Sequence, residues 1–150
     1  MVSVEFYDNN KKAQLRNGDI VMASTGKVSL GKVDLVEFED DAIADGHISI
    51  IRIDDTKYNK QFFVYFFRSI LGAFQIERDF TGATNQIDLY PGQIEAFLIP
   101  DIPLSKQAKI VEEIKLQLDS QKDIEIKIAQ KQDKISRIIE DAIILKPTHD

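Results

Sequence analysis

Residues 105–145 read SKQAKIVEEIKLQLDSQKDIEIKIAQKQDKISRIIEDAIIL, and this stretch decides the architecture of the chain. It contains neither Gly nor Pro, and its many Ile, Lys, Glu and Gln residues favour a helix. Ser105 follows Pro103 and Leu104, where a serine can cap a helix N-terminus. At 1.5 Å per residue, about 40 residues span on the order of 60 Å, far more than a small domain covers. The sequence therefore predicts one long helix that needs a partner.

Apolar residues recur three and four positions apart along this helix, which is the spacing of a coiled-coil seam. Gln121, Glu125 and Gln132 interrupt the seam. The pattern is compatible with an antiparallel pair, with a self-folded hairpin and with docking on another protein. The predicted partner interface consists of Val111, Ile114, Leu118, Ile128, Ile135, Ile139 and Ala142.

The residues before the helix have the composition of one folded domain. The chain is 150 residues long and 43% apolar, which is enough for one ordinary core. Short apolar runs rich in β-branched residues predict strands, separated by Asn, Gly, Asp and Ser. The predicted strands lie at Val2–Tyr7, Asp19–Ser24, Lys32–Phe38, Gly46–Ile53 and, closed by Pro100, at Gln93–Ile99.

Between the predicted strands, the segment KQFFVYFFRSILGAF at residues 60–74 predicts a largely buried helix, because Phe63, Phe66, Phe67, Ile70 and Leu71 recur at helical spacing. The polar segment ERDFTGATNQ at residues 77–86 predicts a loop. We therefore expect an α+β fold with a mixed or antiparallel sheet and one packed helix. The domain would cover residues 1–103, the long coiled-coil-like helix residues 104–145, and a tail residues 146–150.

Several classes of protein are excluded by what the chain lacks. It has no cysteine, hence no disulfide, thiolate metal site or cysteine nucleophile. No run approaches the roughly 18 consecutive apolar residues of a membrane-spanning helix, and the N-terminus has no basic region followed by an apolar one. We expect a cytoplasmic protein without membrane contact. His47 and His149 lie far apart, and His47 is expected to make a structural hydrogen bond at a strand end.

Residues 26–32, GKVSLGK, match the spacing of a phosphate-binding P-loop. Val33 stands where a Ser or Thr would bind magnesium, and the following KVDLVEF predicts a strand where a P-loop needs a helix. A hairpin with a basic tip is the preferred interpretation, and a nucleotide hydrolase is the weakest alternative. The acidic residues between positions 34 and 45 lack the spacing of a calcium loop. We expect no metal, no cofactor and no catalytic residues.

Two polar loops have the chemistry of DNA contact, since hydroxyls and Lys suit phosphates whereas Arg, Asn and Gln can pair with base edges. The candidate DNA-binding residues are Ser24, Thr25, Lys27, Ser29 and Lys32 in the first loop, and Arg78, Thr81, Thr84, Asn85 and Gln86 in the second. The charge opposes this interpretation, because residues 1–104 hold ten basic and sixteen acidic side chains. Any DNA contact must come from a local patch or depend on a basic partner.

Four segments, in their order and spacing, resemble the specificity subunits of type I restriction-modification systems over nearly the whole chain. They are LRNGDIVMASTG at 15–26, ADGHISIIRID at 44–54, QFFVYFFRSILGAFQIERDFTGATNQ at 61–86 and FLIPDIPLSKQAKIVEEI at 97–114. The GATNQ loop followed by the helix start at IPDIPLSKQAKIV is the most telling. The family usually has an acidic residue before Gln107, where this chain has Lys106, a departure that concerns helix capping.

The resemblance implies a non-catalytic subunit that reads double-stranded DNA. In that family two target recognition domains each read half of a split target, and long antiparallel helices space them and dock the modification subunits. Methyl transfer from S-adenosylmethionine and ATP-driven cleavage would belong to the partner modification and restriction subunits, so this chain should bind neither cofactor. Only one predicted strand precedes the GDI segment. We therefore expect a partial recognition domain: a truncated or excised piece, or a half-subunit whose helix pairs with a second copy or with another specificity half.

A second hypothesis is a coiled-coil interaction protein without DNA contact, acting as a regulatory or vestigial partner of a modification subunit. The acidic domain favours it. A basic surface patch on the folded domain would favour DNA binding instead, because DNA readers concentrate their charge locally. The target sequence and the oligomeric state stay open at the level of sequence.

Overall fold

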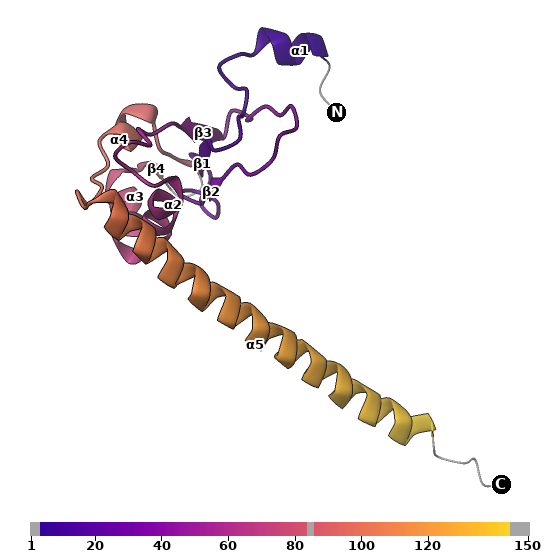
Figure 1. Cartoon of the computed structure of the whole chain (residues 1–150). Helices are drawn as coiled ribbons and strands as arrows, with labels where there is room; N and C mark the ends of the chain where they lie inside the picture. The colour runs from indigo at the N-terminus through magenta and orange to yellow at the C-terminus, as the bar shows by residue number, and fades with distance from the viewer. Residues whose placement is uncertain (1–3, 84–85, 145–150) are drawn as a thin grey trace, which may run out of the picture. The chain divides into compact units, whose positions relative to one another are not determined.

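The structure, a computed structural model, describes residues 4–83 and 86–144. Its internal contacts divide the chain into two compact units, residues 1–111 and 112–150. The architecture is the α+β fold that the sequence predicts. The elements, in chain order, are α1 (Val4–Asn9), β1 (Ile20–Ala23), β2 (Val33–Leu35), β3 (Ile48–Ile51), α2 (Lys60–Arg68), α3 (Ile70–Asp79), β4 (Thr81–Ala83), β5 (Gln86–Asp88), α4 (Pro91–Glu95) and α5 (Leu104–Ile144) (Figure 1).

The larger sheet has three antiparallel strands in the order β2-β1-β3. In the central strand, Ile20 lies opposite Leu35 of β2 and Ile51 of β3. Because side chains alternate along a strand, Ile20 and Met22 share one face, and both are fully buried. Strands β4 and β5 form a separate antiparallel hairpin. The predicted strands at residues 19–24, 32–38 and 46–53 are therefore confirmed.

The hydrophobic core lies where α2 packs against the larger sheet. Phe67 is its centre, with ring centroids 4.7 Å from Phe63, 5.2 Å from Phe66 and 5.2 Å from Phe97. Aromatic rings at such distances add to the stabilisation that their burial provides. The aromatic run is thus largely core, as its helical spacing predicts. The buried members of the core are Ile20, Met22, Val33, Phe63, Val64, Phe67, Ile76, Leu89 and Phe97.

The single helix predicted over residues 60–74 is wrong, because the chain forms two helices here, α2 and α3. Ser69 between them is extended, and its N–H and Oγ both donate to the carbonyl of Phe66, at 3.1 and 2.6 Å. Gly72 permits the turn, since a Cβ there would lie 2.3 Å from the Cα of Phe67. The change of direction leaves Ile70 and Leu71 exposed, contrary to the prediction.

The strand predicted at Val2–Tyr7 is also wrong over its described part, where residues 4–9 form the short helix α1. No described strand pairs with this segment, so strand formation would leave its backbone groups without partners. Asn10 follows the helix, and its Nδ2 donates to the carbonyl of Phe6 at 2.7 Å.

The strand predicted at Gln93–Ile99 is wrong as well. The chain forms α4 there and continues without strand pairing, with Phe97 buried in the core. Pro91 begins the helix, where its fixed φ is favourable. Gln93 stabilises the same turn, because its Oε1 accepts the Tyr90 N–H at 2.7 Å. Local capping overrides the β propensity of the apolar residues.

Helix α5 begins at Leu104, one residue before the predicted cap Ser105. The carbonyl of Pro103 accepts the first helical N–H groups instead, from Lys106 at 2.9 Å and Gln107 at 3.0 Å. Gln107 is completely buried, and its amide bonds to Asn59 N–H and to the carbonyls of Lys57 and Ile102, at 2.8 to 3.0 Å. The start of α5 is thereby fixed to the first unit.

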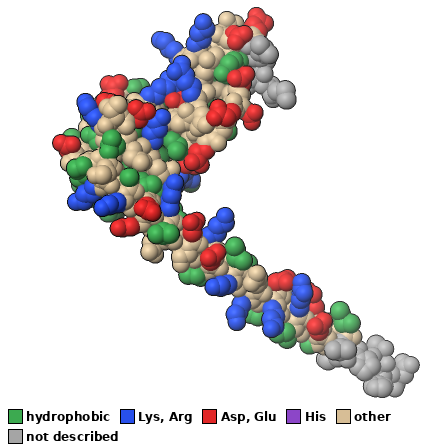
Figure 2. Space-filling model, in the orientation of Figure 1, with side chains coloured by type: hydrophobic (Ala, Val, Ile, Leu, Met, Phe, Trp, Pro, Cys, Tyr) green, Lys and Arg blue, Asp and Glu red, His purple; other side chains and the backbone are tan. Residues whose placement is uncertain are grey.

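Beyond Ile114, every described residue of α5 is exposed. Hydrophobic side chains alternate with charged ones along the helix (Figure 2). An exposed helix of this length gains little from tertiary packing, which normally supplies most helical stability. None of the described helices combines the length and hydropathy that a membrane span requires.

Candidate nucleic-acid interface

The two candidate DNA-binding loops, although some 50 residues apart in sequence, lie side by side. The N–H of Gly26 donates to the carbonyl of Ile87 at 3.0 Å, and the N–H of Leu89 donates to the carbonyl of Ser24 at 2.8 Å. An isolated antiparallel bridge joins Thr25 to Asp88 between these bonds. The turn after β1 and the β4–β5 hairpin therefore form one continuous edge, which we call the loop face (described residues 24–32, 78–83 and 86–88).

Residues 24–32 form the predicted hairpin, since they connect the antiparallel strands β1 and β2. Gly26 and Gly31 have φ of 89° and 76°, a backbone region that other residues rarely adopt. The chain continues into β2 at Val33, so no helix N-terminus follows the glycines. The P-loop reading fails on this geometry, because a P-loop passes directly into a helix.

Three of the candidate hydroxyls are already hydrogen-bonded within the first unit. Ser24 is buried, and its Oγ donates to the carbonyl of His47 at 3.1 Å. Thr25 Oγ1 is hydrogen-bonded to Nδ1 of His47 at 2.7 Å, and Ser29 Oγ donates to the carbonyl of Thr25 at 2.8 Å. These side chains shape the loop. The structural hydrogen bond predicted for His47 is confirmed.

A groove of about 640 Å³ runs beside the hairpin, and Lys27 and Lys32 line it. Its other charged side chains are Arg68 and Glu77, and its floor is apolar, with Leu30, Ile76 and Phe80 among the lining residues. Arg68 pairs with Asp34 at 2.9 Å, whereas neither lysine forms an ion pair with a described residue. The groove is therefore a locally basic surface on an acidic chain.

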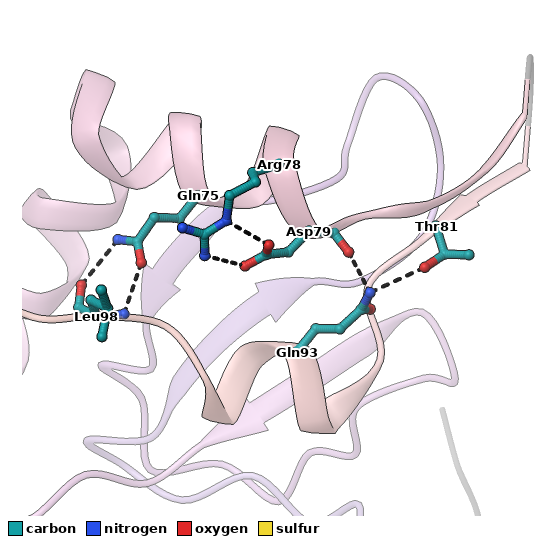
Figure 3. Close-up of polar contacts among 6 residues, drawn as sticks. All are labelled: Gln75, Arg78, Asp79, Thr81, Gln93 and Leu98. Carbon is teal, nitrogen blue, oxygen red and sulfur yellow. Dashed lines mark hydrogen bonds and ion pairs between the residues drawn. The ribbon is translucent and has the colours of Figure 1, made fainter.

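The loop predicted over residues 77–86 is wrong over its described part, which forms the end of α3 and strands of the β4–β5 hairpin. Its arginine, in the last turn of α3, is already held. Arg78 donates from Nε and Nη2 to the two carboxylate oxygens of Asp79, at 2.7 and 2.6 Å (Figure 3). The hydrogen bonds from Arg78 lower the pKa of Asp79, and they raise that of Arg78. Thr81 Oγ1 accepts from Gln93 Nε2 at 3.1 Å. Thr84, Asn85 and the side chain of Gln86 lie outside the described part of the structure.

Two glutamines that the sequence analysis did not select hold this loop in place. Gln93 Nε2 donates to the carbonyl of Asp79, so α4 is tied to the end of α3 (Figure 3). Gln75 bonds both backbone groups of Leu98, at 2.7 and 3.0 Å. Arg68 was missed too, because in sequence it is one cation within an apolar helix. No local pattern marks these residues.

The predicted helix interface is only partly available to a partner. Val111 is 7% exposed and belongs to the core side of the first unit, and Ile114 is half-buried. The seam residues further along α5 are open: Leu118, Ile128, Ile135, Ile139 and Ala142 are all exposed. The interface available to a partner therefore starts after Ile114.

Within the described residues, no group of three or more His, Asp and Glu side chains could hold a metal ion. The acidic residues between positions 34 and 45 are mostly exposed, and Asp34 is paired with Arg68. This part of the chain has the character of a solvated acidic loop.

Comparison with known proteins does not assign the chain. A scan against protein-family models finds no match, and a search of curated proteins finds no similar sequence.

Proposed function

We propose that this chain is a sequence-specific DNA-recognition module of a type I restriction-modification system, directing partner methyltransferase and restriction subunits to a split DNA target. It acts without catalysis of its own. The first unit contacts double-stranded DNA, and α5 pairs with a second copy or with another specificity half.

The observation that carries this proposal is the loop face. Two segments chosen for their DNA-binding chemistry are joined by backbone hydrogen bonds. Nothing in the sequence indicates that these two segments are adjacent in the fold. DNA recognition requires such convergence, because groups that position phosphates must lie beside groups that read base edges.

The charge around the loop face also supports DNA binding. Lys27 and Lys32 line one groove, and both are exposed. DNA readers place their positive charge locally, so a net charge of −6 does not oppose contact at this surface. The acidic side chains elsewhere would limit nonspecific affinity and favour dependence on a basic partner subunit.

The proposal is tested by the salt dependence of binding to random-sequence duplex, with and without a modification subunit. We compare the chain with a variant carrying Lys27→Ala and Lys32→Ala. Each lysine that contacts a phosphate contributes about one unit to the slope of log affinity against log salt. The double variant should bind more weakly and lower the slope by about two.

The matched control carries Lys11→Ala and Lys12→Ala, which removes the same charge from two exposed lysines away from the loop face. Its salt slope should stay close to that of the unmodified chain. Equal losses in both variants would mean nonspecific attraction only. Failure of the unmodified chain to bind duplex under both conditions would reject the proposal.

A second candidate function rests on the exposed seam of α5. Leu118, Ile128 and Ile135 are 45%, 51% and 58% exposed, which fits a protein whose main role is helix pairing. Such a protein would occupy a modification subunit without contacting DNA. It would form the protein complex normally, and neither lysine pair would change its behaviour.

A further inference from the structure

Arg78 presents only part of its hydrogen-bonding capacity to Asp79. A guanidinium has five N–H donors, one on Nε and two on each Nη. Asp79 accepts from Nε at 2.7 Å and from Nη2 at 2.6 Å, so it occupies the side edge of the group. The end edge, with one Nη1 donor and the second Nη2 donor, is not bonded to Asp79, and neither is the other Nη1 donor. The Arg78 side chain is 48% exposed.

The carboxylate that holds Arg78 is itself held. Asp79 is the last residue of α3 and only 22% exposed at its side chain. Its carbonyl accepts a hydrogen bond from Gln93 Nε2, and the same nitrogen reaches Thr81 Oγ1 at 3.1 Å (Figure 3). Gln93 is fixed in turn through the Tyr90 N–H at 2.7 Å. The arginine therefore stands on a tied framework at the junction of α3 and the β4–β5 hairpin.

An ion pair between neighbouring surface residues adds little to stability, so the main effect of Asp79 on Arg78 is to orient it. The remaining edge of Arg78 offers two parallel N–H groups. These match the O6 and N7 acceptors that guanine presents in the major groove. Holding the side edge reduces the rotamer freedom that the arginine would otherwise lose on binding a base.

We infer that Arg78 reads a guanine through its Nη1/Nη2 edge, with Asp79 as the positioning residue that orients it. This inference rests on the proposed DNA-recognition function. It names one base class and one donor edge within the loop face.

The test is selection from a randomised duplex library by the full chain, followed by sequencing of the bound duplexes. The unmodified chain should enrich guanine at one position. Arg78→Lys keeps the charge but removes the bidentate fork, so that preference should fall by roughly 5- to 150-fold. Total affinity for random duplex and its salt slope should change little. Arg137→Lys is the matched control, since Arg137 is an exposed arginine paired with Asp133 at 3.1 Å on α5.

The variant Asp79→Asn tests whether Asp79 orients Arg78 or only neutralises its charge. Removing the carboxylate lowers repulsion of phosphate, so random-sequence affinity should rise, while the loss of orientation should reduce guanine preference. A rise in affinity with unchanged preference would overturn the positioning role of Asp79.

The other outcomes are distinct. If the chain enriches a sequence but Arg78→Lys leaves that sequence unchanged, the guanine inference fails and the proposed function stands. If the chain binds duplex but enriches no base, sequence-specific recognition fails together with the guanine inference. If the chain binds no duplex at all, both fail.

Discussion

Asp19, in the GDI segment, is buried with its charge satisfied. Its side chain is 6% exposed, and Arg52 donates to both carboxylate oxygens at 2.8 and 2.7 Å. The N–H of Arg16 donates to the same carboxylate at 2.9 Å. Burial by itself raises the pKa of Asp19, but the hydrogen bonds from Arg52 and Arg16 outweigh it and hold the pKa below its usual value. The ionised form is thus the one that the fold stabilises.

Asp19→Asn should therefore destabilise the first unit in a pH-dependent way. A carboxyl with a lowered folded-state pKa contributes stability above its unfolded pKa of about 3.9, and this is lost as pH falls through the folded pKa. Urea unfolding at pH 7 should show a loss of about 1–3 kcal/mol, the usual cost of weakening buried hydrogen bonds to a charged group. Below about pH 4 the two proteins should converge. A constant difference from pH 7 to pH 3 would contradict this account.

The structural roles of two glutamines could not be predicted from the sequence. Gln107 bonds to residues 48 and 50 positions away, and Gln75 to one 23 positions away. Their roles depend on which distant backbone groups arrive beside them, and no spacing in the sequence carries that information. Lys27 and Arg78, by contrast, were selected because exposed basic residues in polar loops have recognisable chemistry. Both residues belong to the loop face, and their contact with DNA stays a prediction.

At the scale of elements, hydrophobic periodicity predicted the strands that are stabilised by burial. It missed helix boundaries that are set by local capping hydrogen bonds. The strands at β1, β2 and β3 follow from apolar β-branched runs that a sheet can bury. The break between α2 and α3 depends on Ser69 bonding Phe66 and on the close approach that Gly72 permits. Apolar spacing continues through that break, so it suggests one helix where the backbone makes two.

The seam of α5 carries information about how it pairs. In an antiparallel pair that places Leu118 against the partner's Ile135, Gln121 meets the partner's Gln132 and Glu125 meets the partner's Ile128, so no two carboxylates face each other in the seam. In a parallel pair in register, Glu125 would face the same carboxylate of the partner, which is unfavourable. The antiparallel arrangement is therefore expected.

Because the chain has no cysteine, introduced thiols can test this arrangement. Leu118→Cys and Ile135→Cys are made as separate single variants and oxidised alone and as a mixture. An antiparallel pair should give a disulfide-linked dimer mainly in the mixture, since only there do two thiols come within bonding distance. Efficient linking of each variant with itself would indicate a parallel pair. No linking in any sample would indicate that α5 does not pair with its own copy in this register.

At the scale of the whole molecule, charge is unevenly arranged. The chain carries −6 overall, yet Lys27, Lys32 and Arg68 meet at one groove beside the loop face. The net charge therefore does not predict the charge of this surface, because the basic patch forms only when the chain folds. If two copies pair through α5, a twofold axis relates their loop faces, and two equal half-sites should occur as an inverted repeat.

A variant that cannot pair should lose this symmetry without losing recognition. Leu118→Glu with Ile135→Glu places charge in the seam, whereas Leu116→Glu with Ile126→Glu, the matched control, adds the same charge at exposed apolar positions off the seam. On a duplex with two inverted half-sites, selected with the unmodified chain, the seam variant should bind on the order of 10²- to 10⁴-fold more weakly, because the second contact is no longer intramolecular. On a single half-site the two variants should bind alike. Measurement of the mass in solution checks that the seam variant is monomeric and that the control is not.

If the monomeric variant still prefers the double site to the same extent as the unmodified chain, recognition of a split target does not depend on pairing through α5.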